Sequence, residues 1–419
     1  MKSHQLNETF WRSFAKTYWE EKSIVVKNID SELRELDQNE VFKLLVAASD
    51  QSRRDKAPLG FKFFVNGIRS SDVETMFVLP KRSDLSLLGY HERMERIYQD
   101  YCLVCDELLQ VNQDKQAILN RFTRDLYKQT GFPNRFAEMG LYLGNYRKTP
   151  FGVHIDRCGV FSFPVIGEKK FRVWSSDYVA KHPDLEQSFR YAKHKEKSQL
   201  LTAEPGDMSY WPSSAWHIAE SNGKFSATWS LGVWVDRTTN EVASEIVSSL
   251  LKSKLGELIN EPAIHAGQLQ NEDGEVKSLP KIFEEIISSL KDLTKEELIN
   301  SFTEIWMKRL SSHGMKTLPR TDGKFQLSTS IKLRHIESPI LWSMKKGATS
   351  VKPNFSFSFA GNDPMNSRSK HFLKLLKDLN HGRDCKIDEY LLGATRASDL
   401  TELKLLGDLG AFADTRSAP

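Results

Sequence analysis

The hexapeptide Phe151-Gly152-Val153-His154-Ile155-Asp156 is the most informative stretch of this chain, together with Ala215-Trp216-His217 further along. His154 and Asp156 are two residues apart in a segment of strand character, so their side chains leave the same face of a sheet. His217 has to arrive from a second strand to join them. The pattern therefore predicts a site at which two imidazoles and one carboxylate converge on a metal ion.

The sequence between the two histidines is typical of a β-rich domain. Residues 160–166 and 171–174 have the composition of strands and are separated by a turn-like segment that contains Gly167. Residues 208–212 read as a further strand, and the turn Pro212-Ser213-Ser214 follows them directly. This turn is expected to deliver the second histidine to the site.

Two histidines and one carboxylate on one side of a metal leave its opposite side open, as in non-haem Fe(II) oxygenases. A single histidine is more often structural than metal-binding, so further features must support the assignment. Lys169 lies beyond the turn on the next strand, where its ammonium can meet the distal carboxylate of an acidic cosubstrate. Ser226, Thr228 and Ser230 alternate, so their hydroxyls share one strand face. Such a polar face suits a wet pocket better than a dry core.

These motifs resemble the JmjC-type, double-stranded β-helix 2-oxoglutarate oxygenases, and more closely the bacterial cupin branch related to the ribosomal oxygenases. The matching segments are 151–156, 160–169, 205–217 and 226–230. Near the start of the chain, residues 10–22 also resemble the segment with which these proteins begin. The resemblance therefore extends over nearly the whole chain.

Three positions depart from the pattern of that branch. Pro164 stands where glutamine is usual, Val153 replaces proline, and Arg157-Cys158-Gly159 replaces a more acidic run. We expect these residues to line the mouth of the pocket. The departures therefore leave the identity of the substrate open, while the chemistry is less affected.

The resemblance implies a mixed α+β chain with a double-stranded β-helix (jelly-roll, JmjC/cupin) catalytic domain. His154, Asp156 and His217 would bind Fe(II) and leave coordination positions open for 2-oxoglutarate and O2. An enzyme of this type hydroxylates a C–H bond and releases succinate and CO2. The implied activity is therefore that of a 2-oxoglutarate-dependent dioxygenase.

The resemblance also implies which residues hold the cosubstrate. Lys169 would pair with the far carboxylate of 2-oxoglutarate, and Tyr142 would hydrogen-bond the same carboxylate. Ser230 would supply a second hydroxyl, with Thr228 as the nearby alternative. The charge of Lys169 would select a dicarboxylate over a monocarboxylate, because charge-assisted hydrogen bonds contribute about 1.5–3 kcal/mol.

Three domains are expected. Residues 1–236 would form the catalytic domain with an N-terminal elaboration, 237–312 a helical module, and 313–419 a winged-helix-like domain. Apolar residues recur at helical spacing after residue 236, which supports the boundary between the first and second domains. Relatives use such a module for dimerisation, so a homodimer is one expectation, although the apolar stripes could equally close on themselves. Acidic residues interspersed in the last domain favour protein contacts over direct nucleic-acid binding.

Composition bounds the remaining alternatives. The chain has 59 basic and 55 acidic residues, a balance that gives no strong reason to invoke a nucleic-acid partner. Since no apolar run approaches the ~20 residues that cross a bilayer, we expect a soluble, cytoplasmic protein with no membrane partner. Cys102 and Cys105 have zinc-like spacing but no second pair, and we expect structural thiols within a helix over residues 93–109.

Two classes of function remain. The first is an oxygenase whose substrate is a polypeptide, either a ribosomal protein or a biosynthetic precursor peptide; a variant of it acts on a free amino acid or small biosynthetic intermediate. The second is a non-catalytic interaction protein, against which the intact triad and Lys169 argue. More than 180 residues follow the predicted catalytic domain, and a small free substrate gives them no evident use. We therefore favour the polypeptide substrate.

Overall fold

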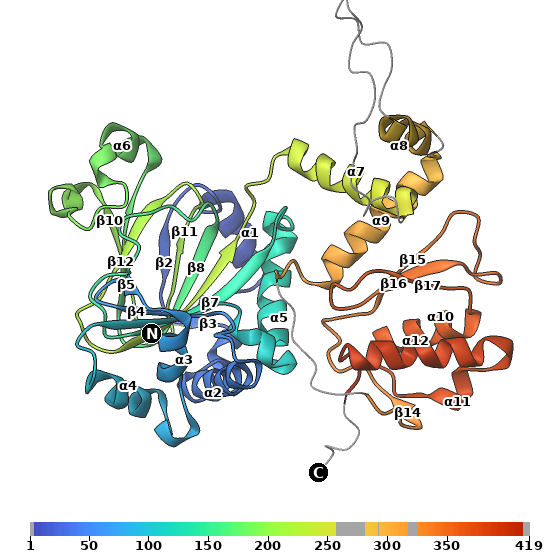
Figure 1. Ribbon diagram of the computed structural model, residues 1–419, viewed down its shortest axis with the longest axis horizontal. Coiled ribbons are helices and arrows are strands. Elements are labelled where there is room, and N and C mark those ends of the chain that lie inside the picture. The colour runs from blue at the N-terminus through green and yellow to red at the C-terminus, as the bar shows by residue number, and fades with distance from the viewer. Residues whose placement is uncertain (1–3, 257–280, 292, 317–324, 414–419) are drawn as a thin grey trace, which may run out of the picture.

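Two antiparallel sheets form the centre of the N-terminal half of the molecule (Figure 1). The computed structural model describes residues 4–256, 281–291, 293–316 and 325–413. The larger sheet has the strand order β2-β11-β8-β13-β7-β6-β4-β5, and the smaller has the order β10-β9-β12. Their bounds are β2 (Ile24–Val26), β4 (Phe61–Val65), β5 (Ile68–Arg69), β6 (Tyr101–Cys105), β7 (Ala137–Gly144), β8 (Gly159–Ile166), β9 (Lys169–Trp174), β10 (Gln199–Ala203), β11 (Met208–Trp211), β12 (Trp216–Glu220) and β13 (Ser226–Val233). The expected mixed α+β content is confirmed.

Helices cover the outer face of the larger sheet. Trp11 of α1 lies 5.2 Å from Phe122 of α5 between ring centroids, and Phe122 lies 5.9 Å from Phe161 of β8. These aromatic side chains belong to the main hydrophobic core. The helices of this half are α1 (Glu8–Thr17), α2 (Gln38–Asp55), α3 (Asp72–Val78), α4 (Leu87–Glu95), α5 (Gln113–Thr130) and α6 (Ser176–Lys181), and a short parallel pair is formed by β1 (His4–Gln5) and β3 (Ile29–Asp30).

Alternation along β13 separates the apolar core from a polar space between the sheets. Trp229 and Leu231 are buried in the main core. Thr228 and Ser230, which point the other way, line a pocket together with residues of the smaller sheet. Thr228 and Ser230 of the predicted polar stripe therefore line the pocket between the two sheets, whereas its third member, Ser226, is buried and is not part of the lining.

The expected helix over residues 93–109 is wrong beyond α4. Cys102 and Cys105 lie on β6, a central strand of the larger sheet whose five residues are all buried. A strand covered on both faces has a continuous apolar sequence, and periodicity alone does not distinguish it from a buried helix. Both thiols are free, as expected for structural cysteines.

The C-terminal half has a hydrophobic core of its own. This half of the chain follows α7 (Thr239–Leu255), α8 (Lys281–Lys291) and α9 (Lys295–Ser311), which lie apart from the two N-terminal sheets in Figure 1. Its elements are β14 (Ser330–Ile331), β15 (Leu341–Met344), β16 (Phe355–Ser358), β17 (Met365–Ser367), α10 (Lys370–Asn380), β18 (Cys385–Lys386), α11 (Ile387–Tyr390) and α12 (Arg396–Asp408). Residues 257–280 of the predicted helical module lie outside the described residues. The division into three domains, the winged-helix-like assignment and the homodimer stay predictions.

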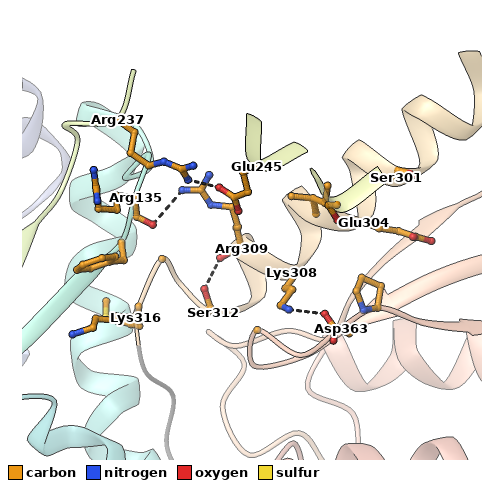
Figure 2. A pocket seen from close by; sticks show the side chains of 17 residues that line it. Arg135, Arg237, Glu245, Ser301, Glu304, Lys308, Arg309, Ser312, Lys316 and Asp363 are labelled. Carbon is orange, nitrogen blue, oxygen red and sulfur yellow. Dashed lines mark hydrogen bonds and ion pairs between the residues drawn. The ribbon is translucent and has the colours of Figure 1, made fainter. Parts of the chain in front are cut away.

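A cavity of about 520 Å³ lies where α7 and α9 meet the N-terminal half. Figure 2 shows Arg237 directed toward Glu245 and Lys308 toward Asp363, and these residues form ion pairs. Arg309 donates instead to the backbone oxygen of Pro133 at 3.0 Å. Because its charged groups largely satisfy one another, this cavity has the character of a polar junction. Of the helices that the structure describes, none is both long enough and apolar enough to cross a membrane.

Candidate metal centre and adjoining pocket

His154 and His217 are brought together by the backbone. The two residues form an antiparallel bridge, in which His154 N donates to His217 O at 3.0 Å and His217 N donates to His154 O at 2.8 Å. Directly opposed residues in such a pair carry their side chains on the same face. The two imidazole centroids consequently lie 4.3 Å apart.

Asp156 completes a compact triad with these two histidines. Its Oδ1 lies 3.5 Å from His154 Nε2, and its Oδ2 lies 3.3 Å from His217 Nε2. One ligand atom from each residue falls within 4.8 Å of the others. The carboxylate is 38% exposed, whereas the His217 side chain is 5% exposed, so the triad is open on the side of Asp156.

The opposite ring nitrogens set the imidazole tautomers. His154 Nδ1 lies 2.9 Å from Gly152 O, and His217 Nδ1 lies 3.3 Å from Ala215 O. A carbonyl oxygen only accepts hydrogen bonds, so each Nδ1 must carry the hydrogen and each Nε2 keeps its lone pair. Both lone pairs are therefore available to a metal, with the backbone carbonyls orienting the rings.

The surroundings of His154 and Asp156 favour the protonation states in which these two residues bind a metal. Burial lowers the pKa of His154, and the neighbouring His217 lowers it further. Burial alone would raise the pKa of Asp156, but the interactions with His217 and then His154 outweigh it and lower that pKa to about 2. A neutral imidazole and an ionised carboxylate are the forms that coordinate metal ions.

The triad opens into a pocket between the two sheets. Tyr142 of β7 and Ser162 of β8 line it from the larger sheet, and Lys169 and Phe171 of β9 from the smaller. The structure brings every residue predicted for the site into this one pocket. These residues are His154, Asp156, His217, Lys169, Tyr142, Thr228 and Ser230.

Lys169 is a buried cation that contacts a tyrosine. Its residue is 2% exposed, and its ammonium donates to the Tyr146 hydroxyl and lies 4.4 Å from the centroid of the Tyr146 ring. Among the described residues, no carboxylate forms an ion pair with it. Burial lowers the pKa of Lys169 to about 8. An uncompensated buried charge is costly, which makes this position a strong candidate for an anionic ligand.

Tyr146 is a site residue that sequence reasoning missed. The prediction assigned the tyrosine partner of the cosubstrate carboxylate to Tyr142, which lines the pocket, whereas the hydrogen bond to Lys169 involves Tyr146. β7 ends at Gly144, where φ is +153° and a Cβ would lie 2.1 Å from Tyr101 O. The chain changes direction there, so strand alternation did not indicate where Tyr146 would point.

Three buried polar atoms that line the pocket have no hydrogen-bond partner among the described residues. They are Ser162 Oγ, Thr228 Oγ1 and Trp211 Nε1. Each buried donor left unsatisfied costs about 1–3 kcal/mol, so a polar ligand or water is expected to meet them. Ser162 was also missed, although it lies within a predicted strand. Its register opposite Ser230, which places both hydroxyls on the pocket face, was not evident from that strand alone.

The residues at the mouth of the pocket are not those that the sequence predicted. Val153 is fully buried against Trp174 and Ile218, because alternation points it away from the face that carries His154. Arg157 and Pro164 are also absent from the residues that line the pocket. Phe151 occupies the mouth instead, 37% exposed and with its ring centroid 5.5 Å from that of His154.

Comparison with known proteins agrees with this architecture. Residues 117–241 match the family model of the JmjC domain. The X-ray structure of Escherichia coli ycfD is 14% identical over 96% of this chain and 97% of that chain, with a TM-score of 0.53. A structure described as YcfD, a ribosomal oxygenase from Escherichia coli, is 14% identical over 98% of this chain and 99% of that chain, also with a TM-score of 0.53.

A third structure, of the same ribosomal oxygenase in complex with cobalt and 2-oxoglutarate, is 15% identical over 96% of this chain and 97% of that chain, with a TM-score of 0.52. Among the curated proteins, no relative matches the chain. The family model thus matches one segment of the chain, and the solved structures share its fold along nearly its whole length. Residues 117–241 are therefore similar to the JmjC domain, within a fold that the chain shares with the structure of the ribosomal oxygenase YcfD.

Proposed function

We propose that this protein is an Fe(II)- and 2-oxoglutarate-dependent oxygenase that hydroxylates a side chain of a protein or peptide. The observation that carries the proposal is the buried Lys169, which forms no ion pair with any described residue and lies in the same pocket as the triad of His154, Asp156 and His217. A metal bound by the triad would occupy one end of the pocket. A dicarboxylate would extend from this metal, through one carboxylate, to Lys169 at the other end, through its second carboxylate.

The donor set fits Fe(II) and leaves room for further ligands. His154 Nε2, His217 Nε2 and one oxygen of Asp156 are two nitrogens and one oxygen on one side of an ion, the arrangement of the facial triad. The bound metal and 2-oxoglutarate would together supply the oxidising chemistry that places one oxygen atom of O2 in a C–H bond, with succinate and CO2 as co-products. The complex of YcfD with cobalt and 2-oxoglutarate supports the same pair of ligands.

The residues around Lys169 fit the far carboxylate of the cosubstrate. Lys169 and the hydroxyl of Tyr146 would face one or both oxygen atoms of this carboxylate. Thr228 and Ser230 line the same pocket as Lys169. The orphaned hydroxyl of Thr228 would thereby gain the partner that it lacks. Charge-assisted contacts of this kind are strongest when water is excluded.

Aromatic side chains form an apolar wall of the pocket beside the triad. The ring of Trp211 lies 4.4 Å from that of Phe171 and 4.8 Å from that of His217, measured between centroids. Phe171 and Trp211 belong to the small core between the sheets. This apolar packing favours reaction of the substrate over loss of the oxidising equivalent to solvent.

A polypeptide substrate is supported by the architecture beyond the JmjC domain. The C-terminal half has its own hydrophobic core, and the ribosomal oxygenase YcfD shares the fold along its whole length. A ribosomal protein and a biosynthetic precursor peptide are the two candidates, and a single side chain of either would enter past Phe151. The modules outside the catalytic domain would then hold the rest of the polypeptide.

The test is mass spectrometry of peptides from a cell extract treated with purified protein, Fe(II) and 2-oxoglutarate. We expect a peptide to gain the mass of one oxygen atom with the wild-type protein and not with Asp156→Ala. A mixture of free amino acids is treated in parallel. Oxidation of a free amino acid alone would contradict the polypeptide substrate, and the absence of any Asp156-dependent oxidation or succinate formation would contradict the proposed enzyme class.

A further inference from the structure

Glu20 forms a dense set of hydrogen bonds far from its neighbours in sequence. Its carboxylate accepts from the backbone N–H of Ser213, with 3.2 Å between Ser213 N and Oε2, and from the Ser213 hydroxyl. The Tyr210 hydroxyl donates to Oε1 at 3.2 Å and accepts from the backbone N–H of Glu20 at 2.8 Å. Glu20 itself has a left-handed φ of 57°. A non-glycine residue adopts this conformation at some cost, which the contacts of its side chain offset.

Ser213 belongs to the turn that carries His217 to the metal centre. The turn joins β11 to β12 and is closed by a hydrogen bond from Ala215 N to Pro212 O at 3.0 Å. The carbonyl of Ala215 is the group that faces His217 Nδ1 at 3.3 Å. Glu20 is therefore bonded to the turn whose carbonyl orients one of the candidate ligands.

Glu20 also packs against the segment that carries Asp156. Gly159 begins β8 three residues after Asp156, and a Cβ at this glycine would lie 2.7 Å from Glu20 Oε1 and 3.2 Å from the Trp19 ring. The φ of Gly159 is not in the positive range, so the position needs glycine for space and not for backbone freedom. The absence of a side chain at Gly159 admits the Glu20 carboxylate.

We propose that Glu20 is a positioning residue that holds the His217 turn and the Asp156 segment in the geometry needed for metal binding. It contacts both segments without itself belonging to the triad. Residues that orient ligands from outside the coordination sphere tune metal affinity, because small displacements of ligand atoms weaken binding. This inference rests on the proposed metal site.

The experiment compares Co²⁺ affinity and thermal stability among variants of the full chain. Glu20→Ala removes the carboxylate, and Gly159→Ala displaces it while retaining Glu20. Glu20→Gln keeps an oxygen that accepts from Ser213 N–H, and Glu21→Ala is the control at the exposed neighbouring position. Isothermal titration calorimetry with Co²⁺ alone measures metal binding without any turnover.

We expect Glu20→Ala to weaken Co²⁺ binding by about tenfold. Gly159→Ala should weaken it in the same direction, Glu20→Gln should recover a large part of the affinity, and Glu21→Ala should bind as the wild type does. A Glu20→Ala protein that melts earlier but binds Co²⁺ with wild-type affinity would overturn the positioning role. If Glu20→Ala does not fold, wild-type Co²⁺ affinity in Gly159→Ala would overturn it. The wild type and Asp156→Ala are measured alongside: equal binding by these two would count against the proposed metal site itself.

Discussion

Replacement of Lys169 by methionine separates the binding role of this residue from its effect on stability. Methionine keeps much of the length of the side chain but removes the charge. The cosubstrate carboxylate would then be buried without its cation, at a cost of about 1.5–3 kcal/mol. This corresponds to a rise of roughly tenfold to a hundredfold in the apparent KM for 2-oxoglutarate. In the ligand-free protein the change removes an unpaired buried charge, so the midpoint of thermal unfolding should stay the same or rise.

The assay is succinate formation at increasing 2-oxoglutarate concentrations, with thermal unfolding recorded for the same preparations. Lys170→Met is the matched control, because alternation along β9 directs Lys170 to the opposite face, where its ammonium lies 2.6 Å from Glu168. We expect this control to leave the KM for 2-oxoglutarate unchanged. An unchanged KM in Lys169→Met would refute the assignment of Lys169 as the carboxylate anchor. A large loss of stability in this variant would show that the buried charge has a partner in the folded protein.

The remaining predictions concern the metal, the second anchoring hydroxyl and pH. Asp156→Ala should abolish Co²⁺ binding detected by calorimetry while leaving the circular dichroism spectrum unchanged; retained Co²⁺ affinity would argue against the triad. Tyr146→Phe removes the hydroxyl beside Lys169. The loss of one hydrogen bond worth about 1 kcal/mol should raise the KM for 2-oxoglutarate several-fold. The same rise in Tyr142→Phe and none in Tyr146→Phe would restore Tyr142 as the tyrosine that contacts the cosubstrate carboxylate. Because burial lowers the pKa of Lys169 to about 8 in the folded protein, its charge is present below that pH and lost above it. Binding of 2-oxoglutarate measured by calorimetry should therefore weaken as pH rises through about 8 in the wild type and not in Lys169→Met. The unfolded chain keeps the Lys169 proton to a higher pH than the folded protein does. The folded state is therefore fully destabilised by the buried charge of Lys169 below about pH 8, and this destabilisation decreases as pH rises from about 8 toward the ordinary pKa of lysine.

The candidate ligands could be predicted because their spacing is a local property. His154 and Asp156 share a strand face by alternation alone, and the turn before His217 is evident from its residues. Lys169 and the hydroxyl stripe of Thr228 and Ser230 follow from the same periodicity. Where local signals are ambiguous, prediction failed: the buried strand that carries Cys102 and Cys105 has the uniform apolar sequence of a buried helix.

The sequence by itself determined which side chains could supply the chemistry, because the functional groups of two histidines, a carboxylate and a lysine are the same in any fold. The tertiary structure decided which distant groups meet them. Tyr146 reaches Lys169 after a change in chain direction, Ser162 faces the pocket through its register with β13, and Glu20 joins two ligand-bearing segments from the start of the chain. Such contacts depend on how strands pair and helices pack across long sequence separations. Neither residue type nor spacing specifies them, because a shift of one residue in register would turn every side chain of a strand to its other face.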